Sequence, residues 1–496
     1  MKLKIIYIVF ILIIPAEIWA ACGGSTSGTS PNLTAYDTSY DCVNLAVNTD
    51  AIENDTVTIP AGESTWTATL NITKGITLIG STTCTPTGTA GSDSYSISCD
   101  DATIITSNIT GSAYLINITP STPGDNPDIE ISNLTFDGNL SGNSIIYITT
   151  DNILHPLSNI KLHHNNFKNI NPGNAIYIHN EVYALIYNNI FDNVASNDNG
   201  NSYAFTILGD NCDSFLLDDG DGMTGFSDGK ANFIEDNYFI NNTYIINNAG
   251  EGAKFVARYN NIINGETPTA KIWDVHPPMN NAGSVGAEIY NNYVGGVATS
   301  SAVRFAQVGG KTIVYNNLAN ASGNDGYYIT PWSAVTGLPD DVCEGDFCVD
   351  AEGGVHMSDS YIFNNTRLDG TTLLKISEAD DGDCITEDID WWDDYGVGDT
   401  NFIKNVTANR NLTTCTTDDV YWETDTKKLY RCTLTNTWTK VYEPYTYPHS
   451  LRGEVAPDTS TQTGRMGVDG IGGSTPGRNA VTIPGSTPGR MGVVTH

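Results

Sequence analysis

The chain alternates apolar and polar residues over short segments, and asparagine pairs interrupt this alternation at intervals. The phrase LIYNNIFDNV at 185–194 returns as ARYNNIING at 257–265, EIYNNYVGG at 288–296 and IVYNNLAN at 313–320. Ile, Tyr, Val, Phe and Thr dominate around the pairs, and Gly, Asn and Asp separate the segments. This pattern predicts short β-strands joined by turns, because apolar spacings of three and four residues are not sustained anywhere.

The second Asn of each pair serves to align the repeats. The aligned positions are Asn166, Asn189, Asn237, Asn261, Asn292, Asn317 and Asn365. The period is about 24 residues, with 48 interpreted as two turns and 31 as one turn plus an insertion, and such a period is typical of solenoids. Coils of this size stack as a parallel β-helix. Asn suits a repeated corner because it tolerates a left-handed backbone, and its amide can bond to the Asn of the neighbouring coils.

A second series of strand-like segments follows the corners, from IIYITT at 145–150 to LLKISEADD at 373–381. We expect its apolar residues, among them Ile176, Phe205 and Ile272, to point inward. The segment 55–81 is expected to cap the start of the solenoid, and 420–453 to close its far end as a hairpin.

The predicted fold class is therefore all-β, a right-handed parallel β-helix with a cap at each end and a flexible tail. The tail is rich in Gly, Pro, Ser and Thr. The expected domains are a signal peptide at 1–21, the β-helix with its N-terminal cap at 22–415, a capping hairpin at 416–453 and the tail at 454–496.

Residues 1–21 have the pattern of a secretory signal peptide. Lys2 and Lys4 precede an apolar run from Ile5 to Ile14, which is too short to span a bilayer comfortably. No later stretch is apolar enough to cross a membrane, so we expect a mature chain that is secreted, without membrane insertion. The alternative is a lipid anchor at Cys22, since WAAC resembles a lipoprotein signal.

Ten cysteines indicate an oxidising compartment. Their spacing suggests local disulfide bonds, although sequence alone does not determine the connectivity. The pairs considered are Cys22 with Cys42, Cys84 with Cys99, Cys343 with Cys348, Cys415 with Cys432, and Cys212 with Cys384.

A formal charge of −34 disfavours nucleic acid and anionic membranes as partners, because binding to both requires Lys and Arg. It also repels polyuronates, unless Ca²⁺ bridges carboxylates on both sides. An acidic surface serves solubility outside the cell as well. The sequence makes no prediction of the oligomeric state.

Three pieces of the sequence carry a resemblance to a known family: VTIPAGESTWTATLNITKGITLIG, the block from FVARYNNIING to AVRFAQVGGKTIVYNN, and YEPYTYPHSLRG. The chain resembles secreted bacterial right-handed parallel β-helix proteins of the pectate-lyase-like superfamily, in a large group whose members are mostly uncharacterised. The resemblance extends over about residues 40 to 453 and concerns the whole solenoid. It implies right-handed coiling and a tendency to bind or process polysaccharides.

The chemistry of the family is matched only in part. Superfamily hydrolases that cut pectin carry Gly-His-Gly and Arg-Ile-Lys blocks, and neither occurs in this sequence. The letters IWDVH at 272–276 are similar to the Trp-Ile-Asp-His block of pectate lyases, but in a different order. The second series of segments nevertheless gathers acids, bases and aromatic residues at its C-terminal ends, which predicts a groove suited to general acid–base work.

We expect Asp274, His276 and Arg304 to be catalytic in this groove. The expected substrate-binding residues are Lys271, Trp273, His179, Glu181 and Asp210. The alternative is a set of solvated side chains in which Arg304 pairs with Asp274 or Glu288.

A possible cofactor is Ca²⁺ at Asp219 and Asp221 in DDGDGMTGFSDG, although this loop lacks the closing Glu of a calcium loop. Two functions therefore stay open. The first is a secreted protein that engages an extracellular polysaccharide, as a polysaccharide lyase or a glycoside hydrolase. The second is a non-catalytic cell-surface adhesin or structural stalk.

Overall fold

The computed structural model describes residues 22–111, 113–120, 126–139, 144–150, 156–170, 172–194, 202–209, 229–242, 244–250, 252–263, 271–275, 286–297, 304–308, 311–321, 327–332, 359–368, 374–376, 391–394, 401–410 and 412–453. The chain divides into two compact units, Met1–Ala456 and Pro457–His496, and all described residues lie in the first. Among them, no helix has both the length and the apolar character needed to cross a bilayer.

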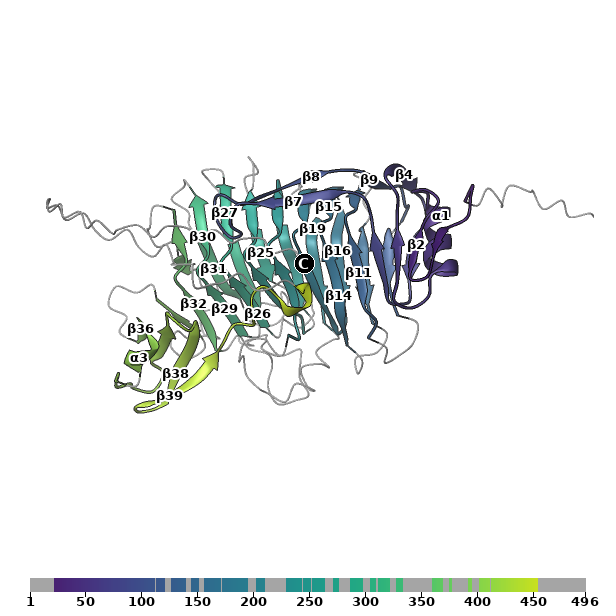
Figure 1. Ribbon diagram of the computed structural model, residues 1–496. Coiled ribbons are helices and arrows are strands. Elements are labelled where there is room, and N and C mark those ends of the chain that lie inside the picture. Colours follow the sequence, from purple (N-terminus) through teal and green to yellow (C-terminus); the bar gives the residue numbers. More distant parts are fainter. Residues whose placement is uncertain are drawn as a thin grey trace, which may run out of the picture. The chain divides into compact units, whose positions relative to one another are not determined.

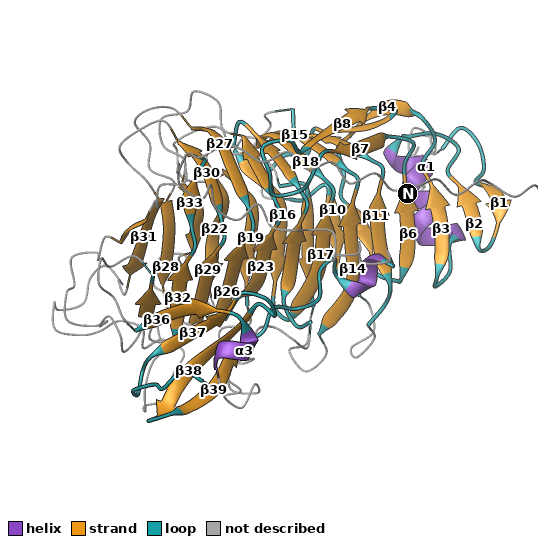
Figure 2. Ribbon diagram, turned by 60° about the vertical axis from the view of Figure 1, so that its left-hand side comes forward, coloured by secondary structure: helices purple, strands orange, loops and turns teal. Residues whose placement is uncertain are grey.

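Three long sheets run along the first unit, and each coil of the chain adds one strand to each of them (Figures 1 and 2). Sheet A has thirteen described strands: β1 (Ser27–Thr29), β2 (Asn32–Thr34), β3 (Asp55–Thr58), β6 (Ile76–Ile79), β11 (Ile129–Ser132), β14 (Leu157–His163), β17 (Val182–Tyr187), β20 (Asn232–Glu235), β23 (Lys254–Arg258), β26 (Gly286–Tyr290), β29 (Lys311–Tyr315), β32 (Ser360–Phe363) and β35 (Trp391–Asp393). All neighbours in sheet A are parallel except β1 and β2.

Sheets B and C each have ten described strands, all parallel. Sheet B contains β4 (Gly62–Trp66), β9 (Thr103–Ser107), β12 (Thr135–Asp137), β15 (Asn166–Ile170), β18 (Ile190–Val194), β21 (Tyr238–Ile240), β24 (Asn261–Ile263), β27 (Tyr293–Val297), β30 (Leu318–Ala321) and β33 (Thr366–Arg367). Sheet C contains β5 (Leu70–Ile72), β10 (Ile116–Ile118), β13 (Ile146–Thr149), β16 (Gly173–His179), β19 (Ser202–Leu208), β22 (Tyr244–Gly250), β25 (Lys271–Val275), β28 (Arg304–Val308), β31 (Tyr327–Trp332) and β34 (Leu374–Ile376). The predicted parallel β-helix is confirmed, and the second series of segments forms sheet C in the expected order.

The asparagine corner lies between sheets A and B, and its two residues have different tasks. The first residue adopts a left-handed backbone, with φ near +54° at Asn188, Asn291 and Asn316. The second residue builds a buried ladder in which each amide bonds to the Asn of the next coil, through Asn165, Asn189, Asn237, Asn260, Asn292, Asn317 and Asn365. The alignment by the second Asn was therefore wrong at Asn166 and Asn261, each of which lies one residue beyond the ladder.

The long spacings in the repeat also need a correction. Asn189 bonds directly to Asn237, 48 residues further along, and Asn317 bonds directly to Asn365 across the same separation. Strands β17 and β20 accordingly pair as neighbours, as do β29 and β32. Each 48-residue interval is thus one coil with insertions and not two coils.

The interior of the solenoid is filled by side chains that stack from coil to coil. In sheet B the rings of Phe136, Phe167, Phe191 and Phe239 follow one another with centroids 5.2, 4.9 and 4.8 Å apart. These rings are fully buried, and burial of such a side chain contributes roughly 1.5–3 kcal/mol. The repeated apolar position therefore holds the coils in register.

The N-terminal end is covered by α1 (Tyr40–Asn44) and the π-helical turn Leu45–Asp50, which contribute Val43 and Val47 to the core. A disulfide joins Cys22 to Cys42, as considered from the sequence. The segment 55–81 was expected to be a cap, but its strands enter all three long sheets as the first full coil.

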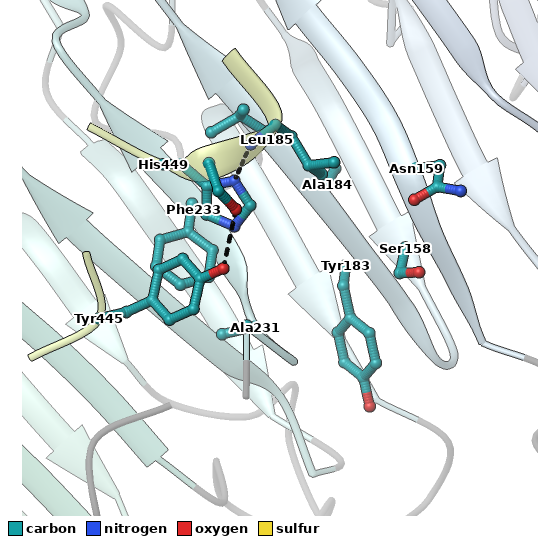
Figure 3. Close-up of a pocket in the computed structure, with 12 residues that line it drawn as sticks. Ser158, Asn159, Tyr183, Ala184, Leu185, Ala231, Phe233, Tyr445 and His449 are labelled. Atoms are coloured by element: carbon teal, nitrogen blue, oxygen red, sulfur yellow. Dashed lines mark hydrogen bonds between the residues drawn. The ribbon is translucent and has the colours of Figure 1, made fainter. Parts of the chain in front are cut away.

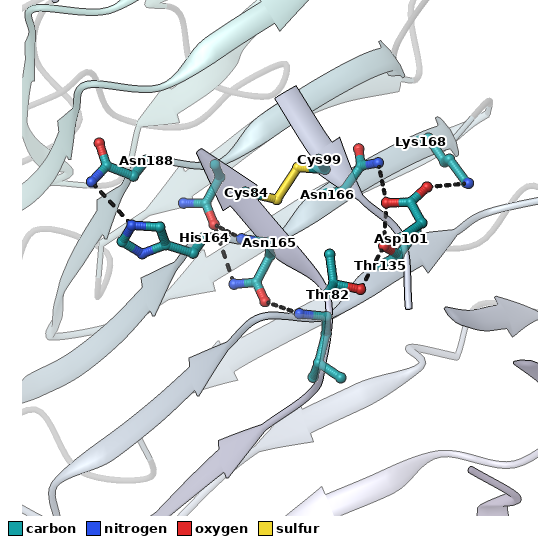
Figure 4. The surroundings of a disulfide bond; sticks show 12 residues. Thr82, Cys84, Cys99, Asp101, Thr135, His164, Asn165, Asn166, Lys168 and Asn188 are labelled. Carbon is teal, nitrogen blue, oxygen red and sulfur yellow. Dashed lines mark hydrogen bonds and ion pairs between the residues drawn. A yellow bond between two sulfur atoms is a disulfide. The ribbon is translucent and has the colours of Figure 1, made fainter. Parts of the chain in front are cut away.

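A two-stranded arm, β7 (Thr83–Thr87) and β8 (Ser96–Asp100), lies across the outer face of sheet B (Figure 4). The disulfide between Cys84 and Cys99 closes it, as predicted. At its end, Asp101 accepts hydrogen bonds from Thr135, Asn166 and Lys168 at 2.7, 2.9 and 2.9 Å. Burial alone would raise the pKa of Asp101, but these bonds and the Lys168 charge lower it, so the carboxylate holds the arm in its ionised form.

The C-terminal end folds back onto sheet A. A second small sheet consists of β36 (Phe402–Asn405), β37 (Val420–Glu423), β38 (Lys428–Leu434) and β39 (Thr437–Tyr442), with the short helix α3 (Thr407–Arg410). The predicted Cys415–Cys432 disulfide is present, whereas Cys212, Cys343, Cys348 and Cys384 lie outside the described residues. A strap, residues 443–453, follows β39 and includes the 3₁₀ turn η3 (Ser450–Arg452).

Candidate functional site

Other segments of the same chain pack on the outer faces of sheets A and B. On sheet A, Phe233 lies in one apolar cluster with Tyr442 of the C-terminal sheet. On sheet B, Ile190 packs with Ile97 of the β7–β8 arm. In the described part of the chain, no hairpin or helix packs across the outer face of sheet C. Tyr177 on β16 is partly exposed, whereas its neighbour Thr206 on β19 is buried, so the part of sheet C up to β16 offers the candidate surface for a ligand.

Tyrosines form a row across sheet C. Tyr147 on β13 pairs in register with Tyr177 on β16, and their ring centroids are 5.3 Å apart. Tyr114, which precedes β10, stacks on Tyr147 at 4.4 Å. All three side chains are partly exposed, whereas Ile146 and Ile148 beside Tyr147 are buried. The strand pleat thus directs the aliphatic residues inward and the phenols outward.

His179 lies at the end of this row. Its Nδ1 atom is 3.2 Å from the Tyr147 hydroxyl, and the tautomer decides which group donates. The next residue, Asn180, has a left-handed backbone and donates from Nδ2 to the Thr149 hydroxyl and the Thr150 carbonyl. This turn fixes His179 at the edge of the sheet, where a phenol and an imidazole in contact are suited to proton transfer.

The predicted catalytic residues fall further along the same sheet. Asp274 on β25 pairs with Ala306 on β28, and Arg304 lies two positions before Ala306. Asp274 and Arg304 are therefore on adjacent strands, but they are not directly opposite each other. The side chains of Lys271, Asp274 and Arg304, and all of His276 and Asp210, lie outside what the structure describes, so these assignments stay predictions.

Two predicted substrate-binding residues are placed differently. Trp273 pairs in register with Ile246 and Phe305 and is fully buried, so it offers no face to a sugar, and that prediction is wrong. Glu181 is also buried, and its carboxylate accepts a hydrogen bond from the Tyr183 hydroxyl at the start of β17. It belongs to the corner next to sheet A, because the left-handed Asn180 turns the chain between the two residues.

A small pocket of about 180 Å³ lies between sheet A and the strap (Figure 3). Tyr183, Phe233, Tyr445 and His449 are among its lining residues. Burial lowers the pKa of His449 to about 4, and its Nδ1 accepts a hydrogen bond from the Leu451 amide at 3.2 Å. His449 is therefore a neutral structural anchor of the strap. The sequence signal for it was the terminal segment YEPYTYPHSLRG.

The tyrosine row was not predicted, although a signal for it existed. Tyr147 and Tyr177 occupy the same position of IIYITT and AIYIHNE, the two segments aligned in the second series. The alignment alone did not indicate a site, because the sequence does not show that the Tyr147 hydroxyl lies next to His179.

Metal binding has no support in the described part of the chain, where no three His, Cys, Asp or Glu side chains are grouped to hold an ion. The predicted calcium ligands Asp219 and Asp221 lie outside the described residues.

No protein-family model matches the chain, and no curated protein matches it. Among solved structures, the chain is similar to ORF18 of Geobacillus virus E2, with 14% identity and a TM-score of 0.24 over 58% of this chain and 57% of that one. It is also similar to the A-module of the mannuronan C-5 epimerase AlgE6 from Azotobacter vinelandii, with 12% identity and a TM-score of 0.32 over 72% and 91% of the two chains. A third similar structure is a mutant of the PL6 family alginate lyase AlyGC, with 14% identity and a TM-score of 0.27 over 70% and 53%.

The chain thus spans little more than half the length of the virus protein and of the lyase. TM-scores this low say nothing about the activity of this chain.

Proposed function

We propose that the protein binds an extracellular polysaccharide along the outer face of sheet C and cleaves it by general acid–base chemistry. The observation that carries this proposal is the contrast between the faces. The C-terminal sheet and the strap cover sheet A from β17 onward, and the β7–β8 arm lies on sheet B, while sheet C presents, up to β16, the partly exposed row of Tyr114, Tyr147 and Tyr177 next to His179. Phenols and an imidazole on an open face suit a ligand that is both flat and rich in hydroxyl groups.

The distribution of long connections supports the same face. From β11 onward, each link from sheet A to sheet B is a two-residue corner, whereas the long insertions of these coils lie at both ends of sheet C strands. In the coil of β19 they are residues 195–201 and 209–231, and in the coil of β31 they are residues 322–326 and 333–359. Binding residues are commonly carried by loops on a rigid scaffold.

In the proposed groove, the Tyr147–His179 pair binds one part of the glycan and can relay a proton. Asp274 and His276 act as the acid and the base at the bond that is cleaved, and Arg304 stabilises negative charge there. Strands β16 and β25 are three strands apart in sheet C, which corresponds to about 14 Å. The Tyr147–His179 pair and the predicted catalytic residues therefore contact different sugar units of one polysaccharide chain.

The test is to incubate the full chain with a panel of glycans, with and without Ca²⁺. New reducing ends alone indicate hydrolysis, and reducing ends with ultraviolet absorbance from unsaturated products indicate elimination. We expect activity on at least one glycan, a loss of at least about tenfold in kcat/KM for Arg304→Ala, and a weaker but measurable loss for His179→Ala.

The matched control is His163→Ala, in the same coil as His179 but at the end of the sheet A strand β14. It should leave kcat/KM unchanged. Activity that survives Arg304→Ala would show that the proposed catalytic group is wrong. Absence of both cleavage and binding would favour the structural stalk.

A further inference from the structure

The C-terminal sheet has a pocket of its own, of about 380 Å³, lined by the segment between β36 and β37 and by the start of β39 with the turn before it. The volume lies within the range of roughly 300–1,000 Å³ that is usual for small-molecule sites. The lining residues that matter here are Arg410, Thr413, Thr414, Asn436, Thr437 and Trp438.

Trp438 differs from other tryptophans of the fold. Trp66, Trp273, Trp392 and Trp422 are fully buried, whereas Trp438 is partly exposed. Its indole is held in place, because Nε1 is 3.3 Å from the Thr413 carbonyl and the ring meets Tyr421 edge-on at 5.5 Å. An indole fixed in this way at a pocket is a preformed surface for the apolar face of a sugar ring.

Polar groups surround the indole. Thr414 and Thr437 are exposed, and their hydroxyls have no hydrogen-bond partner among the described residues. Asn436 accepts a hydrogen bond from the Cys415 amide through Oδ1, which fixes the side chain and leaves its Nδ2 group for a ligand. Hydroxyl and amide groups of this kind match the hydroxyls of a sugar.

The pocket carries no uncompensated charge in the described structure. Arg410 Nη1 lies 2.7 Å from Glu423 Oε1, and the guanidinium stacks on Tyr430 at 3.7 Å. A ligand carboxylate would have to compete with Glu423 for this cation. The chemistry therefore favours a neutral sugar over a uronate.

We propose that this pocket binds a short segment of a neutral glycan. Trp438 stacks on one sugar ring, and Thr414, Thr437 and the Asn436 amide bind its hydroxyls. The site holds the protein on a polysaccharide without taking part in cleavage, so it does not depend on the chemistry proposed for sheet C.

The test is titration calorimetry of the full chain with four neutral probes: cellohexaose, laminarihexaose, xylohexaose and mannohexaose. We expect at least one of them to bind, and Trp438→Ala to weaken that binding by at least about tenfold. The Thr414→Val and Thr437→Val double variant should also weaken it, because Val keeps the shape of Thr and removes only the hydroxyl. Since both threonines are exposed, this variant remains informative if Trp438→Ala folds poorly.

The matched control is Thr435→Val, an exposed threonine of the same hairpin that does not line the pocket. It should bind like the wild type. The proposal is overturned if none of the four probes binds, or if Trp438→Ala or the double valine variant binds as tightly as the wild type. Binding that persists in Tyr177→Ala would separate this site from sheet C, so that either proposal can fail alone.

Discussion

Arg258 and Glu235 form an ion pair in which neither side chain reaches solvent. Arg258 Nη2 lies 2.7 Å from Glu235 Oε2, and both side chains are 0% exposed. The same guanidinium donates to the strap carbonyls of Tyr445 and Thr446, at 2.7 and 2.9 Å. The strap thus satisfies donors that would otherwise be buried and unpaired, which joins residues 443–453 energetically to sheet A.

Arg258→Ala should destabilise the fold by about 3–5 kcal/mol, because it removes the nearer of the two cations that pair with buried Glu235 and leaves only Arg452 at 3.3 Å. The measurement is the free energy of unfolding in urea. Lys404→Ala is the control, since Lys404 pairs with Asp394 at 2.7 Å but is 40% exposed, and such a pair contributes about 0–1 kcal/mol. Equal losses in the two variants would contradict the role given to the buried pair.

Two histidines with lowered pKa values should make the folded state less stable in acid. Burial lowers the pKa of His449 and of His164 to about 4, whereas His in an unfolded chain has a pKa of about 6.5. Between these two pH values the unfolded state binds protons that the folded state does not, so the free energy of unfolding falls as the pH falls through this window. For His449 the change is on the order of 3 kcal/mol.

His449→Gln tests this, because the Gln side chain can still accept a hydrogen bond but does not titrate. Its unfolding free energy should vary less between pH values of about 6.5 and 4 than that of the wild type. An unchanged pH dependence would mean that His449 is protonated in the folded protein.

Asp236 should act in the opposite direction. Burial, and next the charge of Glu235, raise the pKa of Asp236 to about 6, compared with about 3.9 in an unfolded chain. The folded state therefore holds this proton more tightly, and the stability it contributes is present below the lower value and is lost as the pH rises through about 6. Asp236→Asn should gain stability relative to the wild type across that window, as followed by urea unfolding. A constant difference between the two proteins would contradict the raised pKa.

The buried asparagine ladder should tolerate little change. Asn237 donates from Nδ2 to the carbonyl oxygens of Ile186 and Glu235, and its Oδ1 accepts from the backbone of Asn189. Asn237→Ala leaves these buried groups unpaired, at about 1–3 kcal/mol for each. Asn117→Ala is the control, because Asn117 bonds to Asn71 in a partly exposed position and does not have a left-handed backbone. Thermal unfolding of the two variants should separate them clearly, and similar midpoints would refute the special role of the ladder.

The position of the β7–β8 arm depends on Gly91. Its φ is +73°, its amide donates to Asn261 Oδ1, and a Cβ there would lie 2.1 Å from the Asn291 carbonyl oxygen. Gly91→Ala should therefore displace the arm, which faster hydrogen exchange in residues 83–100 would reveal. Gly111→Ala is matched in conformation, with φ +84° and nothing within 4 Å of its Cβ, so it should cost only the backbone strain of about 1–2 kcal/mol. The same exchange rates in both variants would contradict the clash.

The sequence predicted the repeat well because one corner recurs, but spacing alone could not assign it. At HHNN and RYNN an additional Asn follows the ladder residue, and only the hydrogen bonds identify Asn165 and Asn260 as its members. A 48-residue interval has the same length whether it contains two coils or one coil with insertions. The pairing of Asn189 with Asn237 decides this, and such a contact is not encoded in the spacing.

The site was harder to predict for a related reason. In IWDV both Ile272 and Trp273 are apolar, so alternation does not say which one points inward, and both are buried in the structure. Glu181 follows His179 by two residues, yet the left-handed Asn180 between them places it at another sheet. His179 was correctly assigned to the end of a sheet C strand because regular pairing extends up to that residue.

The uneven coil lengths have a practical consequence for protein engineering. Asn189 and Asn237 keep their bond across 48 residues, as Asn165 and Asn189 do across 24. Foreign peptides that replace residues 210–228 or 333–358 should therefore leave the register of the stack intact. Strands β19 and β31 are four strands apart in sheet C, so two grafted segments would leave the scaffold about 19 Å apart.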